Sequence, residues 1–267
     1  MSAARSLTIS NIFVYPVKSC GGLALDEASI VDTGFDHDRE WMVVNEDGWF
    51  ITQRQYPFMA TIRPTVGGNI LRLEAPGVKA LEVPITSAYK RPVTVWTSDL
   101  EAYDQGDTAA EWFSKLLGRE CRLVRKTPSM RKIGQKYQVT GSELVGFADS
   151  YPFLLASLAS LDDLNAHMDA SVPITRFRPN IVVAGGEAFQ EDSWRRIKIG
   201  QVTFRVVKPC SRCEMINVDQ QTGERDVQPL DALGGYRRHA KGIWFGQNLV
   251  QETTGVIRVG DALEVLE

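Results

Sequence analysis

The stretch Ile197–Cys213 reads Ile-Lys-Ile-Gly-Gln-Val-Thr-Phe-Arg-Val-Val-Lys-Pro-Cys-Ser-Arg-Cys. Two β-type runs, Ile197–Ile199 and Val202–Val207, flank Gly200-Gln201, a two-residue turn that is typical of hairpins. The second run leads directly into the Lys208–Cys213 segment, which carries two cysteines. We therefore expect a β-hairpin whose second strand ends in a loop with both thiols.

Short apolar runs broken by Gly, Pro or Asp recur along most of the chain and predict further strands. Two more hairpins are predicted, one around Asn45–Gly48 and one around Gly260-Asp261, together with a strand directly after the cysteine pair. The predicted strands outside the opening stretch are Leu7–Tyr15, Trp41–Val44, Trp49–Thr52, Ile70–Leu73, Val93–Trp96, Cys121–Val124, Glu214–Val218, Val256–Val259 and Ala262–Leu266.

Only two segments have a clear helical pattern. Asp107 can cap a helix that places apolar residues on one face and stops at Gly118. Ser160 can cap a second helix that carries acidic residues in its first turn. Many short strands and few helices indicate a mainly β (α+β) fold, either a barrel or a mixed arrangement, rather than a doubly wound sheet.

The composition is that of a folded, soluble protein. The chain has 267 residues, with 30 Lys+Arg against 33 Asp+Glu, so its net charge of −3 gives no footprint for nonspecific nucleic-acid binding. No apolar signal core follows Met1, and no apolar stretch is long enough to span a membrane. We expect a cytoplasmic protein with reduced cysteines that binds neither nucleic acid nor a membrane.

The two thiols of Cys210 and Cys213 leave several roles open. Lys208 and Arg212 beside them favour the thiolate, a soft ligand for thiophilic metals. A structural zinc site lacks the second pair of ligands that such sites require. A redox motif of the thioredoxin type would open a helix, which is not predicted here. Two buried cysteines without chemistry remain the alternative.

Three further segments place cations at strand ends. Tyr15–Gly22 carries Lys18 and Ser19 in a turn whose backbone could bind an anion, although a solvated turn explains the segment equally well. Asp36–Arg39 and Thr175–Asn180 add Arg39, Arg176, Arg178 and Asn180, and in an extended segment Arg176 and Arg178 would share one face. Surface ion pairs would explain each segment alone. Together they predict that Lys18, Arg39 and Arg178 converge with a cysteine on an anionic ligand.

The order of these motifs resembles that of MOSC-domain proteins. The closest resemblance is to the mitochondrial amidoxime-reducing component and its bacterial YcbX-type relatives, and it extends from about Leu7 to Leu266. The shared motifs are Tyr-Pro-Val-Lys-Ser-Cys-Gly-Gly, Asp-Arg-x-Trp-Met-Val-Val, Phe-Ile-Thr-Gln-Arg, Arg-Phe-Arg-Pro-Asn-Ile-Val-Val, Glu-Asp-Ser-Trp, Pro-Cys-Ser-Arg-Cys, Phe-Gly-Gln-Asn and Ile-Arg-Val-Gly-Asp.

The resemblance implies a MOSC-type β-barrel with an additional N-terminal β domain. Residues 1–126 would form the N-terminal domain and residues 127–267 the MOSC domain, although the strands of Leu7–Arg39 could complete the second barrel. The polar segment Thr127–Gly146 would be a mobile connection between the halves.

A site for the molybdenum cofactor is also implied. The metal ligand of the family corresponds to the second cysteine of its motif, Cys213, which would be both the catalytic residue and the molybdenum ligand. The residues implied to hold the cofactor are Lys18, Ser19, Arg39, Arg178, Asn180, Ser211 and Arg212.

The implied reaction is the two-electron reduction of an N–O bond by oxygen-atom transfer. Amidoximes, N-hydroxylated bases and hydroxylamines would be the substrates. No cysteine follows Cys213, so a [2Fe–2S] ferredoxin domain and its cluster are not expected, and electrons would come from a separate ferredoxin- or cytochrome b5-like protein and its reductase.

MOSC domains also occur at the end of molybdenum cofactor sulfurases, behind a pyridoxal-phosphate (PLP) domain; we expect neither that domain nor PLP in this chain. A cofactor- or sulfur-carrier module without its own turnover is therefore the alternative function, and a globular domain without any metal is a third.

Overall fold

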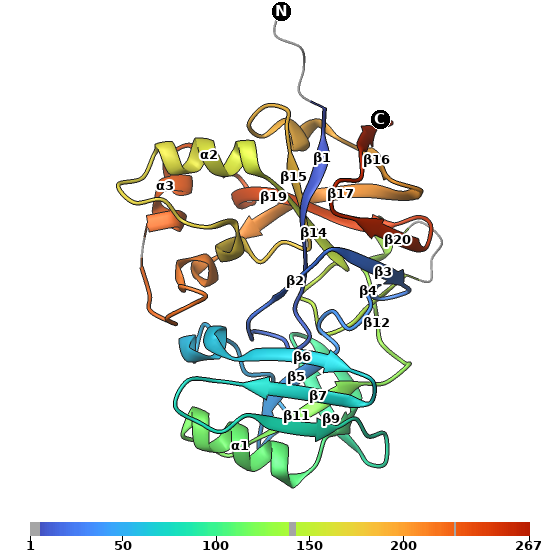
Figure 1. Cartoon of the computed structure of the whole chain (residues 1–267), viewed down its shortest axis with the longest axis vertical. Coiled ribbons are helices and arrows are strands. Elements are labelled where there is room, and N and C mark those ends of the chain that lie inside the picture. Colours follow the sequence, from blue (N-terminus) through green and yellow to red (C-terminus); the bar gives the residue numbers. More distant parts are fainter. Residues whose placement is uncertain (1–5, 139–142, 227) are drawn as a thin grey trace, which may run out of the picture.

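The computed structural model describes residues 6–138, 143–226 and 228–267. Figure 1 shows two lobes stacked along the long axis, with strands dominating both and helices at their outer sides. The predicted mainly β fold with an additional N-terminal β part and a few short helices is confirmed. The division between residues 126 and 127 stays a prediction.

A mixed nine-stranded sheet organises the upper lobe. Its neighbouring strands are antiparallel except for the parallel pair β14–β15. The sheet follows the order β2 (Leu23–Leu25), β1 (Thr8–Val14), β15 (Ile181–Ala184), β14 (Phe153–Ser157), β19 (Gly242–Gln251), β17 (Val202–Arg212), β16 (Arg196–Ile199) and β21 (Leu263–Val265), with β18 (Arg238–His239) paired to β19. The pairing of β1 with β15 brings the beginning of the chain into the sheet built by its second half.

A small sheet of β20 (Gly255–Arg258), β3 (Glu27–Val31) and β4 (Gly34–Phe35) also joins early and late segments. Alternating apolar residues of these two sheets share one core that includes Phe35, Phe153 and Phe204. Phe153 contacts both other rings edge to face, at centroid distances of 4.9 and 5.4 Å.

The lower lobe contains two further antiparallel sheets and one amphipathic helix. The sheets are β5 (Trp41–Asn45), β11 (Cys121–Lys126), β10 (Ser98–Asp104), β9 (Lys90–Val95) in that order, and β6 (Arg63–Gly67), β7 (Ile70–Glu74), β8 (Leu81–Pro84). Helix α1 (Asp107–Leu117) buries Ala109 and Phe113 against this core. It ends at Gly118, whose φ of 66° is the left-handed geometry of a glycine cap.

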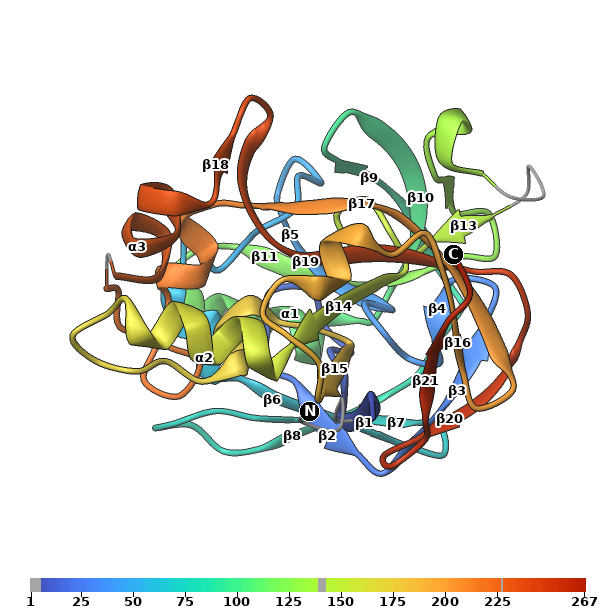
Figure 2. The same ribbon diagram turned by 90° about the horizontal axis from the view of Figure 1, so that it is seen from above.

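The remaining helices lie at one side of the upper lobe (Figure 2). These are α2 (Leu158–Ala166) and α3 (Gln228–Tyr236), which cover a third apolar core. Short 3-10 helices are η1 (Pro57–Thr61), η2 (Gln135–Tyr137), η3 (Ile174–Phe177), η4 (Gln190–Ser193) and η5 (Glu214–Asn217). No helix in the described ranges is long and apolar enough to cross a membrane.

Several local predictions need correction. The opening hairpin is confirmed as β16–β17, but Val256–Val259 and Ala262–Leu266 do not form a hairpin with each other: β20 pairs with β3, and β21 with β16. Glu214–Val218 is not a strand, because η5 occupies it. Trp49–Thr52 makes only isolated bridges.

The predicted helix caps also differ. Gly106 precedes α1, and Asp107 is its first residue. Ser160 lies inside α2, where its hydroxyl donates to the buried Glu191 at 2.7 Å, because a tertiary partner competes with the capping role. In the segment proposed as a mobile connection, β12 (Arg131–Lys132) pairs with β13 (Leu144–Val145), and residues 139–142 lie outside the described part.

Candidate functional site

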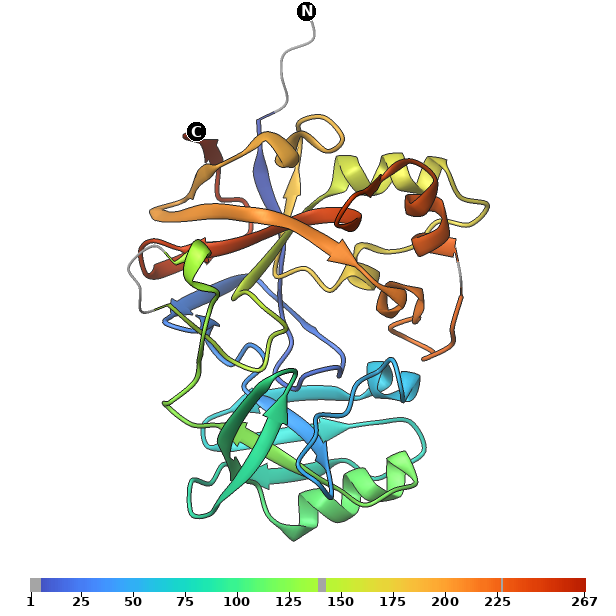
Figure 3. The same ribbon diagram turned by 180° about the vertical axis from the view of Figure 1, so that it is seen from behind.

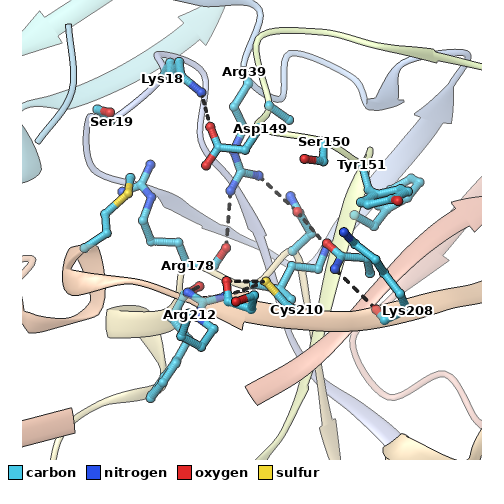
Figure 4. A pocket seen from close by; sticks show the side chains of 18 of the residues that line it. Lys18, Ser19, Arg39, Asp149, Ser150, Tyr151, Arg178, Lys208, Cys210 and Arg212 are labelled. Carbon is cyan, nitrogen blue, oxygen red and sulfur yellow. Dashed lines mark hydrogen bonds and ion pairs between the residues drawn. The ribbon is translucent and has the colours of Figure 1, made fainter. Parts of the chain in front are cut away.

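A cavity of about 270 Å³ lies where the two lobes meet, and β17 forms one of its walls. Seen from behind, the long β17 strand crosses the side of the upper lobe that faces the reader (Figure 3). Among the described residues, the cavity is lined by one carboxylate, Asp149, and by six cations, Lys18, Arg39, Arg176, Arg178, Lys208 and Arg212. The predicted convergence of Lys18, Arg39 and Arg178 with a cysteine is therefore present in the structure (Figure 4).

Lys18 and Ser19 are buried in the turn that follows β1. The Lys18 ammonium donates to the Phe147 carbonyl at 2.8 Å and forms an ion pair with Asp149. Burial lowers the pKa of Lys18, and Asp149 opposes that shift. The Ser19 hydroxyl has no hydrogen-bond partner among the described residues.

The Gly21-Gly22 turn is neither solvated nor an open anion nest. The Gly21 amide donates to the Ile62 carbonyl at 2.8 Å, so its N–H is already used. A side chain at Gly22 would place its Cβ 2.4 Å from the ring of Tyr15. Both glycines are thus explained by close packing of the turn, not by ligand binding.

Arg39 and Asn180 come from distant segments and bond to each other. The Arg39 guanidinium donates to Asp38 at 2.6 Å and to the Asn180 side-chain oxygen at 3.0 Å. The Arg39 backbone has a φ of 44° and donates its N–H to the Tyr15 carbonyl at 2.8 Å. The structure therefore fixes this cation through both its side chain and its backbone.

Arg176 and Arg178 do not lie on an extended segment, because η3 precedes Arg178, which has a φ of 55°. Both nevertheless line the cavity. Arg176 pairs with Asp219 at 3.0 Å. Within the described residues, the Arg178 side chain donates hydrogen bonds only to neutral groups, the shortest to the Gln220 side-chain oxygen at 2.9 Å, and burial lowers its pKa to about 10.

The ring of Tyr15 contacts both Arg39 and Arg178. The guanidinium carbons of Arg39 and Arg178 each lie 4.3 Å from the centroid of its ring. The Tyr15 hydroxyl is buried without a hydrogen-bond partner among the described residues, and burial raises its pKa to about 12. The ring thus lets two like charges pack close together through cation–π contacts.

The thiol segment is a continuation of β17 rather than a loop, because the strand extends to Arg212. Its register against β19 shifts twice, between Val206 and Lys208 and between Pro209 and Ser211. Such irregularities break the alternation of side chains. Lys208, Cys210, Ser211 and Arg212 consequently all line the cavity.

The two cysteines of this segment have different surroundings. Arg212 approaches the Cys210 sulfur at 3.0 Å and donates to the Phe177 carbonyl at 2.8 Å, while its Nε has no partner among the described residues. The Cys213 thiol is exposed, and in the described part of the chain Cys210, not Cys213, belongs to the cavity wall. Cys213 adjoins that wall, since the cavity-lining residues Arg212 and Met215 flank it. All four cysteines are free thiols.

The charges of the cavity are not balanced. Lys18, Arg39 and Arg176 have carboxylate partners. Arg178, Lys208 and Arg212 form no ion pair within the described residues; Lys208 instead lies 5.2 Å from the ring centroid of Tyr151. A multiply charged anion such as a phosphate ester would supply the missing negative charge.

Other contributors were not found from the sequence. Asp149 and Tyr151 line the cavity, and Gln53 and Gln220 hold Arg178. Asp149 and Tyr151 precede β14, so the rule that singled out Asp36–Arg39, polar residues just ahead of a strand, could have found them. The two glutamines carry no local signal.

Comparison with known proteins identifies both halves. Residues 6–120 match the MOSC N-terminal beta barrel domain and residues 142–264 match the MOSC domain. The chain belongs to the MOSC-domain family.

Relatives of this MOSC-domain protein match along nearly its whole length. It is 37% identical to mitochondrial amidoxime-reducing component 1 of Mus musculus, over 97% of this chain and 82% of that protein. The Homo sapiens protein of the same name is 35% identical, over 97% and 83%. A molybdenum cofactor sulfurase of Danio rerio is 34% identical over 93% of this chain, which corresponds to only 32% of the sulfurase.

Proposed function

We propose that this MOSC-domain protein is a molybdenum-cofactor oxidoreductase that reduces N-hydroxylated compounds. The names of its amidoxime-reducing relatives support the reaction. The observation that carries the proposal is the cavity itself, in which three cations that have no carboxylate partner among the described residues lie beside a strand end with two thiols. This combination suits a ligand that has both a phosphate group and a thiophilic metal.

The donors of the cavity fit such a ligand. Arg178, Arg212 and Lys208 would bind the phosphate of the pterin, because their charges lack carboxylate partners. Ser19 Oγ and Arg212 Nε are buried and have no hydrogen-bond partner within the described residues, so a ligand could supply one. Arg39 and Asn180, which bond to each other, would help to orient Arg178, whose carbonyl accepts from Arg39. Lys18 would add a buried cation to the wall, and Ser211 a hydroxyl beside Arg212.

Cys213 would hold the metal through its sulfur, a soft ligand that suits a thiophilic metal. When bound, the cofactor supplies two-electron reduction of an N–O bond by oxygen-atom transfer. Lys208 Nζ and Tyr151 Oη lie on the cavity wall as groups that can hold protons for the amine and water that form. The electrons would come from a separate ferredoxin- or cytochrome b5-like protein and its reductase.

Metal and pterin content of protein purified from a host that makes the molybdenum cofactor tests the proposal. We expect stoichiometric molybdenum and pterin in the parent, loss of molybdenum in Cys213→Ala, and retention in the matched variant Cys210→Ala. Loss in Cys210→Ala alone would transfer the ligand role to Cys210. A parent that contains zinc, or neither metal nor pterin although well folded, would refute the proposal.

A carrier of cofactor or sulfur is the second candidate, supported by the similarity to the sulfurase. The two functions differ in turnover. Reduction of an amidoxime with reduced methyl viologen as electron donor supports the reductase. Exchange of bound cofactor with an acceptor protein, without any turnover, supports the carrier.

A further inference from the structure

An exposed tryptophan and an arginine lie together near the cavity, outside the residues already assigned. Trp96 occupies the turn between β9 and β10, and 38% of its surface is exposed. The guanidinium carbon of Arg54 lies 5.0 Å from the centroid of its ring. The Phe50 ring packs at 4.9 Å from the same side chain, tilted by 56°.

The backbone of Trp96 is strained. Its φ of 57° lies in the left-handed region, which bulky residues rarely adopt and which glycine or asparagine would occupy at lower cost. A large, partly exposed tryptophan side chain therefore occupies a turn position whose backbone geometry favours glycine or asparagine. Strain of this kind concentrates at ligand-binding sites, where the gain in binding offsets it.

Two successive contacts connect Trp96 with the cavity. Phe50, which packs against Trp96, has its ring centroid 5.5 Å from the ammonium nitrogen of the cavity-lining Lys18. On the other side of the pair, Arg54 lies near Asp149 of the cavity wall. Desolvation raises the pKa of the Asp149 carboxyl, but the charges of Lys18 and Arg54 lower it. Neither Trp96 nor Arg54 lines the cavity itself, but both lie just beyond residues of its wall, Trp96 behind Phe50 and Lys18, and Arg54 near Asp149.

The Arg54 side chain is available for a ligand. Within the described residues its guanidinium has no hydrogen bond and no ion pair, and only its backbone carbonyl is engaged, by Arg225. A planar guanidinium beside an indole offers donors to ring nitrogens and carbonyl groups, together with aromatic surface for stacking. Flat heteroaromatic rings satisfy both requirements, whereas small aliphatic groups satisfy neither.

We propose that Trp96 and Arg54 form a stacking subsite for the heteroaromatic ring of N-hydroxylated substrates, such as N-hydroxylated purines. The inference rests on the proposed function, because the N–O group of the same substrate would react inside the cavity. Acetamidoxime, an aliphatic substrate, would occupy the cavity alone. Trp96 and Arg54 would therefore determine specificity without taking part in the reaction.

Steady-state kinetics with two substrates tests this subsite. With reduced methyl viologen as donor, Trp96→Ala should lower kcat/KM for 6-hydroxylaminopurine about tenfold, mainly through KM, since stacking of a base on an aromatic side chain has roughly that effect. The value for acetamidoxime should not change, and Trp96→Phe should recover part of the loss. The matched control is Trp49→Ala, because Trp49 is 51% exposed and no ring or cation contact connects it with the cavity in the described part of the chain.

Two kinetic outcomes would overturn the inference. An equal loss with both substrates, accompanied by a lower Tm, would make Trp96 a structural residue of the turn. A loss that occurs only with a protein electron donor, and not with methyl viologen, would assign the pair to docking of that donor.

Binding to protein purified without the cofactor separates the subsite from the reaction. 6-Hydroxylaminopurine should quench tryptophan fluorescence in the parent, with at least a fivefold weaker affinity in Trp96→Phe and Arg54→Gln. Absence of turnover of any substrate by the cofactor-loaded parent, with this quenching intact, would refute the proposed function and leave the subsite. Quenching that neither variant changes would refute the subsite.

Discussion

The Arg39 guanidinium donates a 3.0 Å hydrogen bond to the side-chain oxygen of Asn180, a residue 141 positions later in the chain. The same oxygen accepts the Leu154 N–H at 3.2 Å, and the Asn180 amide nitrogen donates to the Phe13 carbonyl at 3.2 Å. One buried amide thus connects the Arg39 turn with β1 and β14. The position of the Arg39 guanidinium in the cavity therefore depends on the neutral side chain of Asn180.

Asn180→Ala should therefore affect both stability and anion binding. The substitution leaves the Leu154 amide and the Phe13 carbonyl without side-chain partners, which should lower the free energy of unfolding by about 2 to 4 kcal/mol in urea titrations. The matched control is Asn165→Ala, which also removes two side-chain bonds to the backbone, both to Val172, and neither of these residues lines the cavity among the described residues. It should reduce stability but leave phosphate binding intact. Equal phosphate affinity in both variants would contradict the connecting role of Asn180.

Arg178→Gln should abolish the response of the protein to phosphate. Inorganic phosphate is expected to raise the Tm of the cofactor-free parent at pH 7, because it compensates a buried guanidinium without a carboxylate partner. The variant lacks this charge and should show little shift. Arg196→Gln, which removes an exposed cation paired with Glu252, should respond like the parent. A parent whose Tm does not depend on phosphate would refute anion binding by these cations.

The ring of Tyr15 should matter more than its hydroxyl. Tyr15→Phe removes a buried hydroxyl without a partner and should change the free energy of unfolding by less than about 1 kcal/mol. Tyr15→Leu removes two contacts with guanidinium groups and should cost about 2 to 4 kcal/mol. Tyr103→Leu, where a single lysine lies over the ring, is the matched control with a smaller loss. A large cost of Tyr15→Phe would show that the hydroxyl has a bonding role.

Glu191 should make stability depend on pH. Burial raises the pKa of its carboxyl from 4.5 to about 7, so protonation is favoured in the folded protein. Its contribution is complete below pH 4.5 and is lost as the pH rises through 7, by up to roughly 3 kcal/mol at about 1.4 kcal/mol per pH unit. Glu191→Gln should remove this loss, so that the variant gains stability over the parent between pH 5 and 8.

A carboxylate with the opposite shift provides the control for this measurement. Although desolvation opposes it, the pairing of Glu252 with Arg196 and Arg205 lowers the pKa of that carboxyl. Glu252→Gln should therefore lose stability relative to the parent as the pH rises. Urea unfolding of both variants across the pH range would test the two signs, and parallel curves would contradict the assignment for Glu191.

The strands and α1 could be predicted from the sequence because their signals are local. Apolar alternation and turn residues mark β16 and β17, and a helical face closed by Gly118 marks α1. Strand pairing is different, since β20 and β21 find partners elsewhere in the chain although a turn joins them. A local sequence pattern does not predict which strand elsewhere in the chain has an edge available for pairing.

The residues of the site show the same difference between local signals, which could be predicted, and long-range contacts, which could not. Lys18, Arg39 and Arg178 were predicted to converge, and the structure brings them together. Their neutral supports were not predicted, because Gln220 and the ring of Tyr15 act through contacts that exist only after folding. The extended geometry expected for Arg176 and Arg178 was wrong, since a 3-10 turn precedes the left-handed Arg178.

The pairing of β1 with β15 has a consequence for the living cell. Lys18 and Ser19 leave the ribosome early, whereas β17, which contains Cys210, is synthesised much later. Within the described strands, β1, which precedes these two residues, can pair only with β2 until β15 has been synthesised. The residues that line the cavity therefore come together only after β15 and β17 have been synthesised, so its cations do not face one another on a shorter nascent chain.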